Sequence, residues 1–469
     1  MRSLNFMKRV KTSVAVSAVS LAVVLAPPLK ADNLADALIG AYNTSGLLEQ
    51  NRALLRIADE DAALALSRLR PILDFALTAT RSYSDPSVSN ASNTSTLNAQ
   101  FSASWLLWDG GELRLSLQAT KEVVLATRQT LISVEQTILL RAVSAYVNVL
   151  LQEENVALRR NNLRLLGEEL RAAQDRFEVG EVTRTDVALA ESRVAAARSN
   201  LADSQGDLIT ARAEYTSAVG REPGRLAGQP RLPARAASIS AATAVAVRRH
   251  PDILAAQHQV AAAELRIMAA QKGLGPSLSA TARLGATDNL DISSYSETGS
   301  LSLSLTQRIY QGGGLAAAVR RAMGDRDQRR SLLLTAQRNV RQDVSDAYTR
   351  LQVAVASLAA RAEQVRAAQV AFDGIREEAT LGARTTLDVL SAEQELLNAL
   401  TSQVSARSEQ SIAAFQLLST QGLLTAEQLG LAVQIYDPTL YYNLAKDAPS
   451  ARSKQAKDLD RVLKALGKK

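Results

Sequence analysis

The chain has 469 residues, of which 46% are hydrophobic but only 4% aromatic, and a formal net charge of +7. Such a length exceeds one ordinary globular domain, and so few aromatic residues favour long helices with small-residue packing over a thick aromatic core. The positive charge is concentrated in the first eleven and the last twenty-four residues. Because the body between them is close to neutral, the composition does not predict nucleic-acid binding.

Residues 1–31 are predicted to be an export signal. A basic stretch ending at Lys11 precedes an apolar run over 14–26, which is too short for a confident membrane-spanning helix. Cleavage is expected near Ala31, because Pro27 and Pro28 would obstruct a cut earlier; an uncleaved anchor is the alternative. The chain has no cysteine, which excludes disulfides and a cysteine-linked lipid anchor. With no later apolar run of spanning length, an exported chain of this kind is either soluble in the periplasm or part of a β-barrel.

The chain is predicted to contain two tandem repeats. The stretch FEVGEVTRTDV at 177–187 returns 202 residues later as ATLGARTTLDV at 379–389. The same spacing pairs other glycine, tyrosine and acidic positions: Gly110 with Gly312, Tyr146 with Tyr348, Asp186 with Asp388 and Glu191 with Glu393. A period this long indicates a duplicated domain. We expect repeats at 32–220 and 239–437, a Pro- and Gly-rich linker at 221–238, and an extension at 438–469 with a basic tail.

Very long helices are expected in both repeats. No proline occurs between Pro86 and Pro223 or between Pro276 and Pro438, and proline in a helix interior costs about 3 kcal/mol. A helix from about 111 to 179 would span roughly 100 Å. It would turn at a tip near 178–186 and return as a second helix, and the second repeat would turn near 380–388. Seven-residue spacing in the return helices indicates coiled-coil packing on two seams, one of them Leu390, Leu397 and Val404.

Four strands are predicted, at about 72–83, 97–107, 277–285 and 300–310. Apolar residues alternate there with Ser, Asn, Gln and Thr, as in Leu97 to Leu107, a pattern typical of outer-membrane barrels with a water-filled lumen. Four strands cannot close a barrel, and an open edge is not tolerated in lipid. Several copies must therefore contribute strands, and twelve strands would leave a channel where eight would not. A four-stranded sheet on a soluble domain is the alternative.

These features together resemble the TolC-type outer-membrane efflux and secretion channels. The resemblance covers about 34–442 and rests on WLLWDGGEL and QRIYQGGGL at the strand-to-helix junctions, on the two tip motifs, and on RRHPDILAAQ. The closing IYDPTLYY is similar to the type I secretion branch. The family implies a homotrimeric α+β membrane protein with a twelve-stranded β-barrel, continued by a helical coiled-coil barrel across the periplasm of a Gram-negative cell. It also implies export from an inner-membrane ABC or RND-type pump, through a periplasmic adaptor (membrane fusion protein).

The resemblance assigns a periplasmic gate to the helical tips. Arg384 falls where the family has a constraining arginine, and Thr185 and Asp186 fall where its partners stand. Asp388 matches an acidic pore-facing position, so three copies would attract cations, and Arg184 is a further gate candidate without a counterpart in the family pattern.

The sequence departs from the gate pattern of the family at two positions, and the resemblance also assigns the docking tips and the barrel-to-tunnel turns. Ser391 stands where the family pattern has a second acid and Ala379 where it has an aromatic, which implies a looser and less cation-sensitive gate. The tips that would dock an adaptor contain Gly180, Glu181, Val182, Gly382 and Ala383. The barrel-to-tunnel turns contain Gly110, Gly111, Gly312 and Gly313.

The sequence predicts no enzyme, cofactor or metal site. The two histidines, His250 and His258, are eight residues apart, whereas a helical metal pair would need a spacing of three or four. Gly312 to Gly314 follow a strand and open a helix, but no P-loop lysine follows them. Two other classes stay open at this point: a periplasmic adaptor, which would not need two strand pairs, and an elongated coiled-coil scaffold. The sequence does not identify the cargo.

Overall fold

The computed structural model describes residues 32–84, 92–446 and 453–465. The predicted export signal at 1–31 and parts of the basic tail lie outside the described residues. The helices of the first half are α1 (Leu34–Thr44), α2 (Gly46–Ser67), α3 (Glu112–Glu178) and α4 (Arg184–Val219). Those of the second half are α5 (Ile239–Arg249), α6 (Pro251–Lys272), α7 (Gly314–Thr380) and α8 (Thr386–Thr420), followed by α9 (Pro438–Lys446) and α10 (Lys454–Ala465). The strands are β1 (Ile72–Ser84), β2 (Ser92–Trp108), β3 (Ser277–Asn289) and β4 (Ser294–Thr306).

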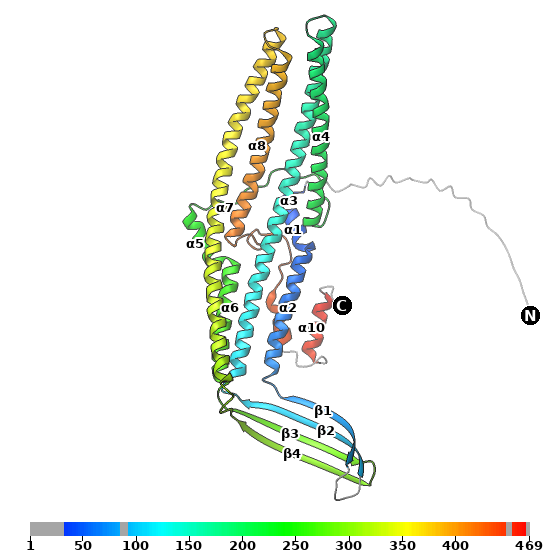
Figure 1. The fold of residues 1–469 in the computed structure, drawn as a ribbon, viewed down its shortest axis with the longest axis vertical. Coiled ribbons are helices and arrows are strands. Elements are labelled where there is room, and N and C mark those ends of the chain that lie inside the picture. The colour runs from blue at the N-terminus through cyan, green and yellow to red at the C-terminus, as the bar shows by residue number, and fades with distance from the viewer. Residues whose placement is uncertain (1–31, 85–91, 447–452, 466–469) are drawn as a thin grey trace, which may run out of the picture.

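The two halves repeat one order of elements, which confirms the tandem duplication. Each half has a short helix, a 22-residue helix, two strands, a 67-residue helix and a return helix. At 1.5 Å per residue, α3 and α7 each extend roughly 100 Å. Figure 1 shows α3 with α4 and α7 with α8 as two hairpins that turn at one end of the molecule, while the four strands lie at the opposite end.

The long helices form a wall one helix thick. In the half nearer the tips, α3 packs against α4 and α8, and α8 packs against α7, so the order across the wall is α4–α3–α8–α7. In the half nearer the sheet, α3 packs against α2 and α6, and α6 packs against α7. α3 contains one window apolar enough to cross a membrane, but 56% of that window is buried inside the protomer. We therefore assign α3 to the wall and not to a membrane span.

The largest hydrophobic cluster lies at mid-height, where the short helices meet the wall. It joins α1, α2, the middle of α3, the end of α4 and the segment after α8. Tyr146 of α3 is fully buried there, and its hydroxyl donates to the carbonyl of Gly228 in the linker at 3.0 Å. The junction of the two halves is thus part of the core.

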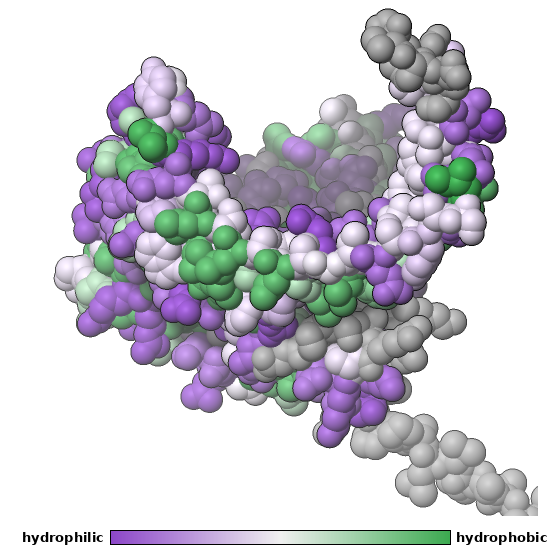
Figure 2. All heavy atoms as spheres, turned by 90° about the horizontal axis from the view of Figure 1, so that it is seen from below, coloured by the Kyte–Doolittle hydropathy of each residue, from purple (hydrophilic) through white to green (hydrophobic). Residues whose placement is uncertain are grey.

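The sheet is antiparallel with strand order β1-β2-β3-β4, and its register sorts side chains onto two faces. Since directly paired residues share a face, one row joins the apolar residues Leu73, Ala103, Ala282 and Leu301. The adjacent row joins the polar residues Asp74, Ser102, Arg283 and Ser300. The apolar face is open, and Leu301 is 83% exposed. Figure 2, seen from the sheet end, shows hydrophobic side chains along the outer side of a curved wall and hydrophilic ones toward its hollow.

The strand bounds differ most from the prediction at β4, which was expected at 300–310 and runs from Ser294 to Thr306. The reason is the register with β3, in which Thr306 pairs with Ser277. Residues 307–310 would have to pair with 273–276, where Pro276 has no N–H to donate and the Gly275 N–H is bonded to Lys272 O at 2.9 Å. β2 is longer than the predicted 97–107 because its pairing with β1 continues to the Ser84–Ser92 pair.

Candidate functional site

The outer face of the sheet carries aromatic side chains at both ends of an apolar band. A bulge between Leu106 and Trp108 brings Trp108 opposite Leu278, so Trp108 shares the apolar face with Trp105. Tyr83 and Tyr295 lie on the same face at the far end of the strands and are 67% and 64% exposed. Two aromatic girdles around an apolar band are the arrangement of a lipid-facing barrel wall.

The turns from strands to long helices depend on paired glycines with left-handed backbone angles. Gly110 and Gly111 have φ values of 68° and 95°, and Gly312 and Gly313 have 56° and 81°. Glycine adopts such angles without the steric cost of a side chain. In the first turn the Asp109 carboxylate also accepts from the backbone N–H of Gly111 at 2.8 Å and of Leu113 at 2.7 Å. The chain thereby reverses from sheet to helix within a few residues.

The two helical tips are short turns of the same construction. The first lies between Glu178 and Arg184 and the second between Thr380 and Thr386. Gly180 and Gly382 have φ values of 81° and 78°, and a Cβ on either would meet no atom within 4 Å. Glycine is therefore needed at these two positions for its backbone angles, and not because a side chain would clash with neighbouring atoms. The other predicted docking residues, Glu181, Val182 and Ala383, lie in the same two turns.

The predicted gate acids cap the return helices. Asp186 accepts from the N–H of Thr183 at 2.9 Å and from its hydroxyl at 2.8 Å. Asp388 accepts from Thr385 in the same way, at 3.0 Å and 2.8 Å. Hydrogen bonds to the backbone and side chain of these threonines lower the pKa of both carboxyls. Both are therefore ionised at neutral pH, at helix N-termini that favour negative charge.

Arg384 has its partner within its own hairpin. Its Nε donates to Glu378 Oε2 at 2.7 Å, and both side chains are about half exposed. Within one protomer, Arg384 does not contact Thr185 or Asp186, and Figure 1 shows the two tips standing apart. Arg184 is the first residue of α4. The gate contact between the two kinds of tip thus stays a prediction about the assembled channel.

Sequence reasoning missed the capping boxes and the Glu378 partner. The capping boxes had a readable signal, since Thr-x-x-Asp at a helix start is a known N-terminal pattern. Glu378 had none, because its link to Arg384 crosses the turn and depends on the path of the tip.

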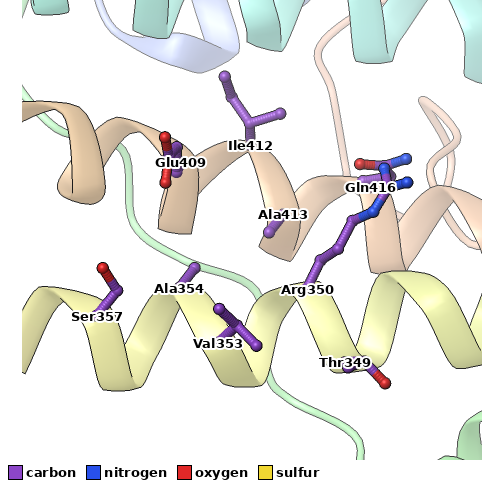
Figure 3. Close-up of a pocket in the computed structure, with 9 residues that line it drawn as sticks. All are labelled: Thr349, Arg350, Val353, Ala354, Ser357, Glu409, Ile412, Ala413 and Gln416. Atoms are coloured by element: carbon purple, nitrogen blue, oxygen red, sulfur yellow. The ribbon is translucent and has the colours of Figure 1, made fainter.

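The second hairpin has a groove between its two helices. This groove of about 410 Å³ is lined by Val353 and Ala354 of α7 and by Ile412 and Ala413 of α8, and Arg350 points toward Gln416 (Figure 3). Its lining contains no histidine, and the described residues contain no cluster of three or more His, Cys, Asp or Glu that could hold a metal.

Comparison with known proteins agrees with this geometry. The family model described as outer membrane efflux protein matches residues 41–221 and 243–423, one match for each half. The chain belongs to the outer membrane efflux protein family. It is 35% identical over 423 residues to the outer membrane efflux protein BepC of Brucella suis, covering 89% of this chain and 91% of BepC.

Two other outer-membrane proteins are also similar to the chain. The chain is 28% identical over 198 residues to the outer membrane protein TolC of Escherichia coli, covering 39% of this chain and 40% of TolC. The Campylobacter jejuni CmeC outer membrane channel has the same fold, with a TM-score of 0.75, 16% identity, and coverage of 88% of this chain and 89% of CmeC.

Membership of this family confirms the predicted fold class, function and location. The chain is an outer-membrane efflux protein, in which the four strands contribute to a trimeric β-barrel continued by a helical barrel. This excludes the adaptor and scaffold alternatives. The family is one of channels and not of enzymes.

Proposed function

We propose that three copies form one conduit that receives substrates at the helical tips and releases them through the barrel. The observation that carries this proposal is the placement of tips and sheet at opposite ends of helices roughly 100 Å long (Figure 1). The aromatic girdles fix the sheet end in the membrane. The tips then reach deep into the periplasm, where a pump complex can deliver its substrate.

The entrance is gated by Arg384 together with Thr185, Asp186 and Asp388. An exposed ion pair such as Arg384 with Glu378 stabilises by only about 0–1 kcal/mol, so the arginine can exchange partners at small cost. The capping bonds use Oδ2 of Asp186, which leaves Oδ1 to accept from an arginine of a facing tip. Three such contacts in the trimer would hold the tips together until a partner separates them. Arg184 lies next to this acid and can supply a second positive charge.

The tips dock a periplasmic adaptor. Each turn presents one exposed aliphatic side chain at the position before its glycine, Val179 at 71% and Leu381 at 78% exposure. The surrounding Glu181, Val182 and Ala383 leave these side chains accessible. A helical hairpin of an adaptor would bury them and would replace the polar contacts of the gate. The inner-membrane pump behind the adaptor is of the ABC or RND type.

A cysteine at the second tip tests the docking proposal. The chain has no native cysteine, so Ala383→Cys can be crosslinked in intact cells and the captured protein identified. Ala362→Cys, on an exposed part of α7 roughly 30 Å below the tip, is the matched control. Capture of an adaptor through Ala383→Cys alone is the expected result.

The identity of the captured adaptor then shows which class of inner-membrane pump works with this channel. An adaptor that works with an ATP-driven exporter indicates protein secretion, and one that works with a proton-driven pump indicates drug efflux. A reactive cysteine that captures no adaptor contradicts docking at this tip, and an unreactive cysteine contradicts the exposure of Ala383.

A further inference from the structure

A buried polar pair joins the two hairpins just below the tips. Asn162 of α3 donates through Nδ2 to Oε1 of Glu393 on α8 at 2.9 Å. Both residues are almost fully buried, with 7% and 3% of their surface exposed. Glu393 lies seven residues after Thr386, the first residue of α8, which places it roughly 10 Å below the tip. The pair therefore spans the seam along which one hairpin would move against the other.

The surroundings of Glu393 do not compensate a negative charge. Leu166, Val194 and Leu390 form the apolar cluster at this seam. The charged groups that face Glu393 are Glu169 of α3 and Arg376 of α7, and these two pair with each other at 3.6 Å. The second oxygen of Glu393, Oε2, is buried and has no hydrogen-bond partner.

Such a site favours the protonated acid. Burial raises the pKa of Glu393 to about 7, against a smaller lowering by the Asn162 hydrogen bond. When the hairpins separate and water reaches the carboxyl, its pKa returns toward the ordinary value near 4.5. The closed seam thus binds a proton more tightly than the open seam, so rising pH favours opening through the interval between these two pKa values.

We propose that Glu393 is a positioning residue of the entrance, whose protonated side chain holds the two hairpins together and whose deprotonation loosens the seam and favours opening of the tips. This inference rests on the proposed gate, since it assigns the pH control of that same entrance. The gate acids themselves do not account for such control near neutral pH. The pKa values of Asp186 and Asp388 are lowered by their threonine partners, so both stay ionised throughout this interval.

The size of the effect follows from linkage. Between pH 5.5 and 8.5, a carboxyl that moves from a pKa of about 7 to one near 4.5 shifts the opening equilibrium by at most about thirty-fold per site. A smaller shift results if water reaches the open seam only in part.

The test compares Glu393→Gln with Glu395→Gln in the purified full-length channel. Glu395 is an exposed carboxyl two residues further along α8, so it controls for the loss of one negative charge on the same helix. Open probability is measured in planar bilayers from pH 5.5 to 8.5. We expect it to rise with pH in the wild type and in Glu395→Gln, and to stay at the low, acidic-pH level in Glu393→Gln. An unchanged pH profile in Glu393→Gln overturns the proposal.

Infrared difference spectroscopy of the same three proteins measures the proton directly. The wild type and Glu395→Gln should lose a carboxylic-acid band as pH rises through neutrality, and Glu393→Gln should not show this band. Absence of the band from the wild type overturns the buried-proton assignment. If the band is present but open probability does not follow it, the coupling to opening is overturned.

The two proposals can fail separately. If Arg384→Ala leaves the conductance unchanged while Glu393 still controls it, the gate residues are wrong and the seam is right. If Arg384→Ala opens the channel and Glu393→Gln keeps the wild-type pH profile, the gate stands and the seam proposal falls.

Discussion

The return helices α4 and α8, of 36 and 35 residues, have the same coiled-coil spacing but differ in which helices cover them. Both pack one seam of small residues within their own hairpin. On α8 the second seam is buried as well, with exposures of 2%, 4% and 7% for Leu390, Leu397 and Val404. The counterparts on α4, 202 residues earlier, are Ala188, Ala195 and Ala202, and all three are exposed. The second seam of the return helix is therefore exposed in the first half and buried in the second half.

The position of the two helices in the wall explains this difference. α8 lies between α7 and α3, whereas α4 is the end of the row and packs mainly against α3. At the other end of the row, α7 leaves Val353 62% exposed. A ring of three copies would bring α7 of one protomer against α4 of the next, in the way that α3 packs against α8. The unfilled seams are then the interfaces of the trimer.

The 202-residue duplication predicts which residues meet between protomers. Adding 202 to Asn162 gives Gln364 on α7, and subtracting 202 from Glu393 gives Glu191 on α4. The buried pair inside a protomer thus predicts a Gln364–Glu191 contact between protomers. In the single protomer Glu191 is exposed.

The largest expected effect comes from blocking the α4 seam. Ala195→Trp adds a large side chain at the counterpart of buried Leu397, so it should prevent trimer formation while leaving the protomer folded. Ala196→Trp is the matched control, because its counterpart Asn398 stays exposed even on α8, which has neighbours on both sides. Light scattering with size-exclusion chromatography measures the outcome. Trimers of Ala195→Trp would show that this face of α4 is not an interface.

A second comparison is between the glycine after the C-terminal end of α4 and the glycine of the tip turn before its N-terminal end. Gly220, with φ of 83°, caps α4, and a Cβ there would clash with the side chain of Thr44. Gly180 has a similar φ of 81° and open space around it. Gly180→Ala should cost about 1–2 kcal/mol of stability from backbone strain alone, and Gly220→Ala about 1–3 kcal/mol more from the clash. Thermal denaturation should rank them accordingly, and equal shifts would contradict the close packing at Gly220.

The smallest stability effect is expected at the gate, where the two tips differ in one ion pair. The counterparts of Arg384 and Glu378 in the first tip are Val182 and Arg176, so only the second tip carries the pair. Arg384→Ala should change stability by about 0–1 kcal/mol yet raise the conductance of the closed channel, because three contacts are lost together. Arg366→Ala, which removes an exposed pair with Glu363 further down α7, is the control. Equal conductance in both variants would exclude Arg384 from the gate.

Much of the fold could be predicted because the signals were local and repeated. The glycines of the tips and junctions mark turns that need left-handed angles, and the alternation in 97–107 encodes a sheet with one apolar face. The end of β4 could not be predicted, because it depends on the register in which β4 pairs with β3, where Thr306 lies opposite Ser277, and not on the composition of 307–310.

The candidate site was less predictable because its contacts join segments far apart in the chain. Asn162 and Glu393 are 231 residues apart, and although the repeat spacing pairs Glu393 with Glu191, nothing in the sequence links it to Asn162. Arg384 was expected to meet Thr185 and Asp186 through the family resemblance, yet within one protomer its partner is Glu378. Only the path of the turn determines which carboxylate it reaches.

Crosslinking between α7 and α4 tests whether the seam inside each protomer is repeated between protomers around a closed ring. With no native cysteine in the chain, Gln364→Cys and Glu191→Cys can be combined in one protein and treated with a short bismaleimide in isolated membranes. We expect covalent dimers and trimers with both substitutions and only monomers with either one alone. Absence of crosslinked species from the double variant, with both cysteines reactive, would contradict a seam repeated between protomers.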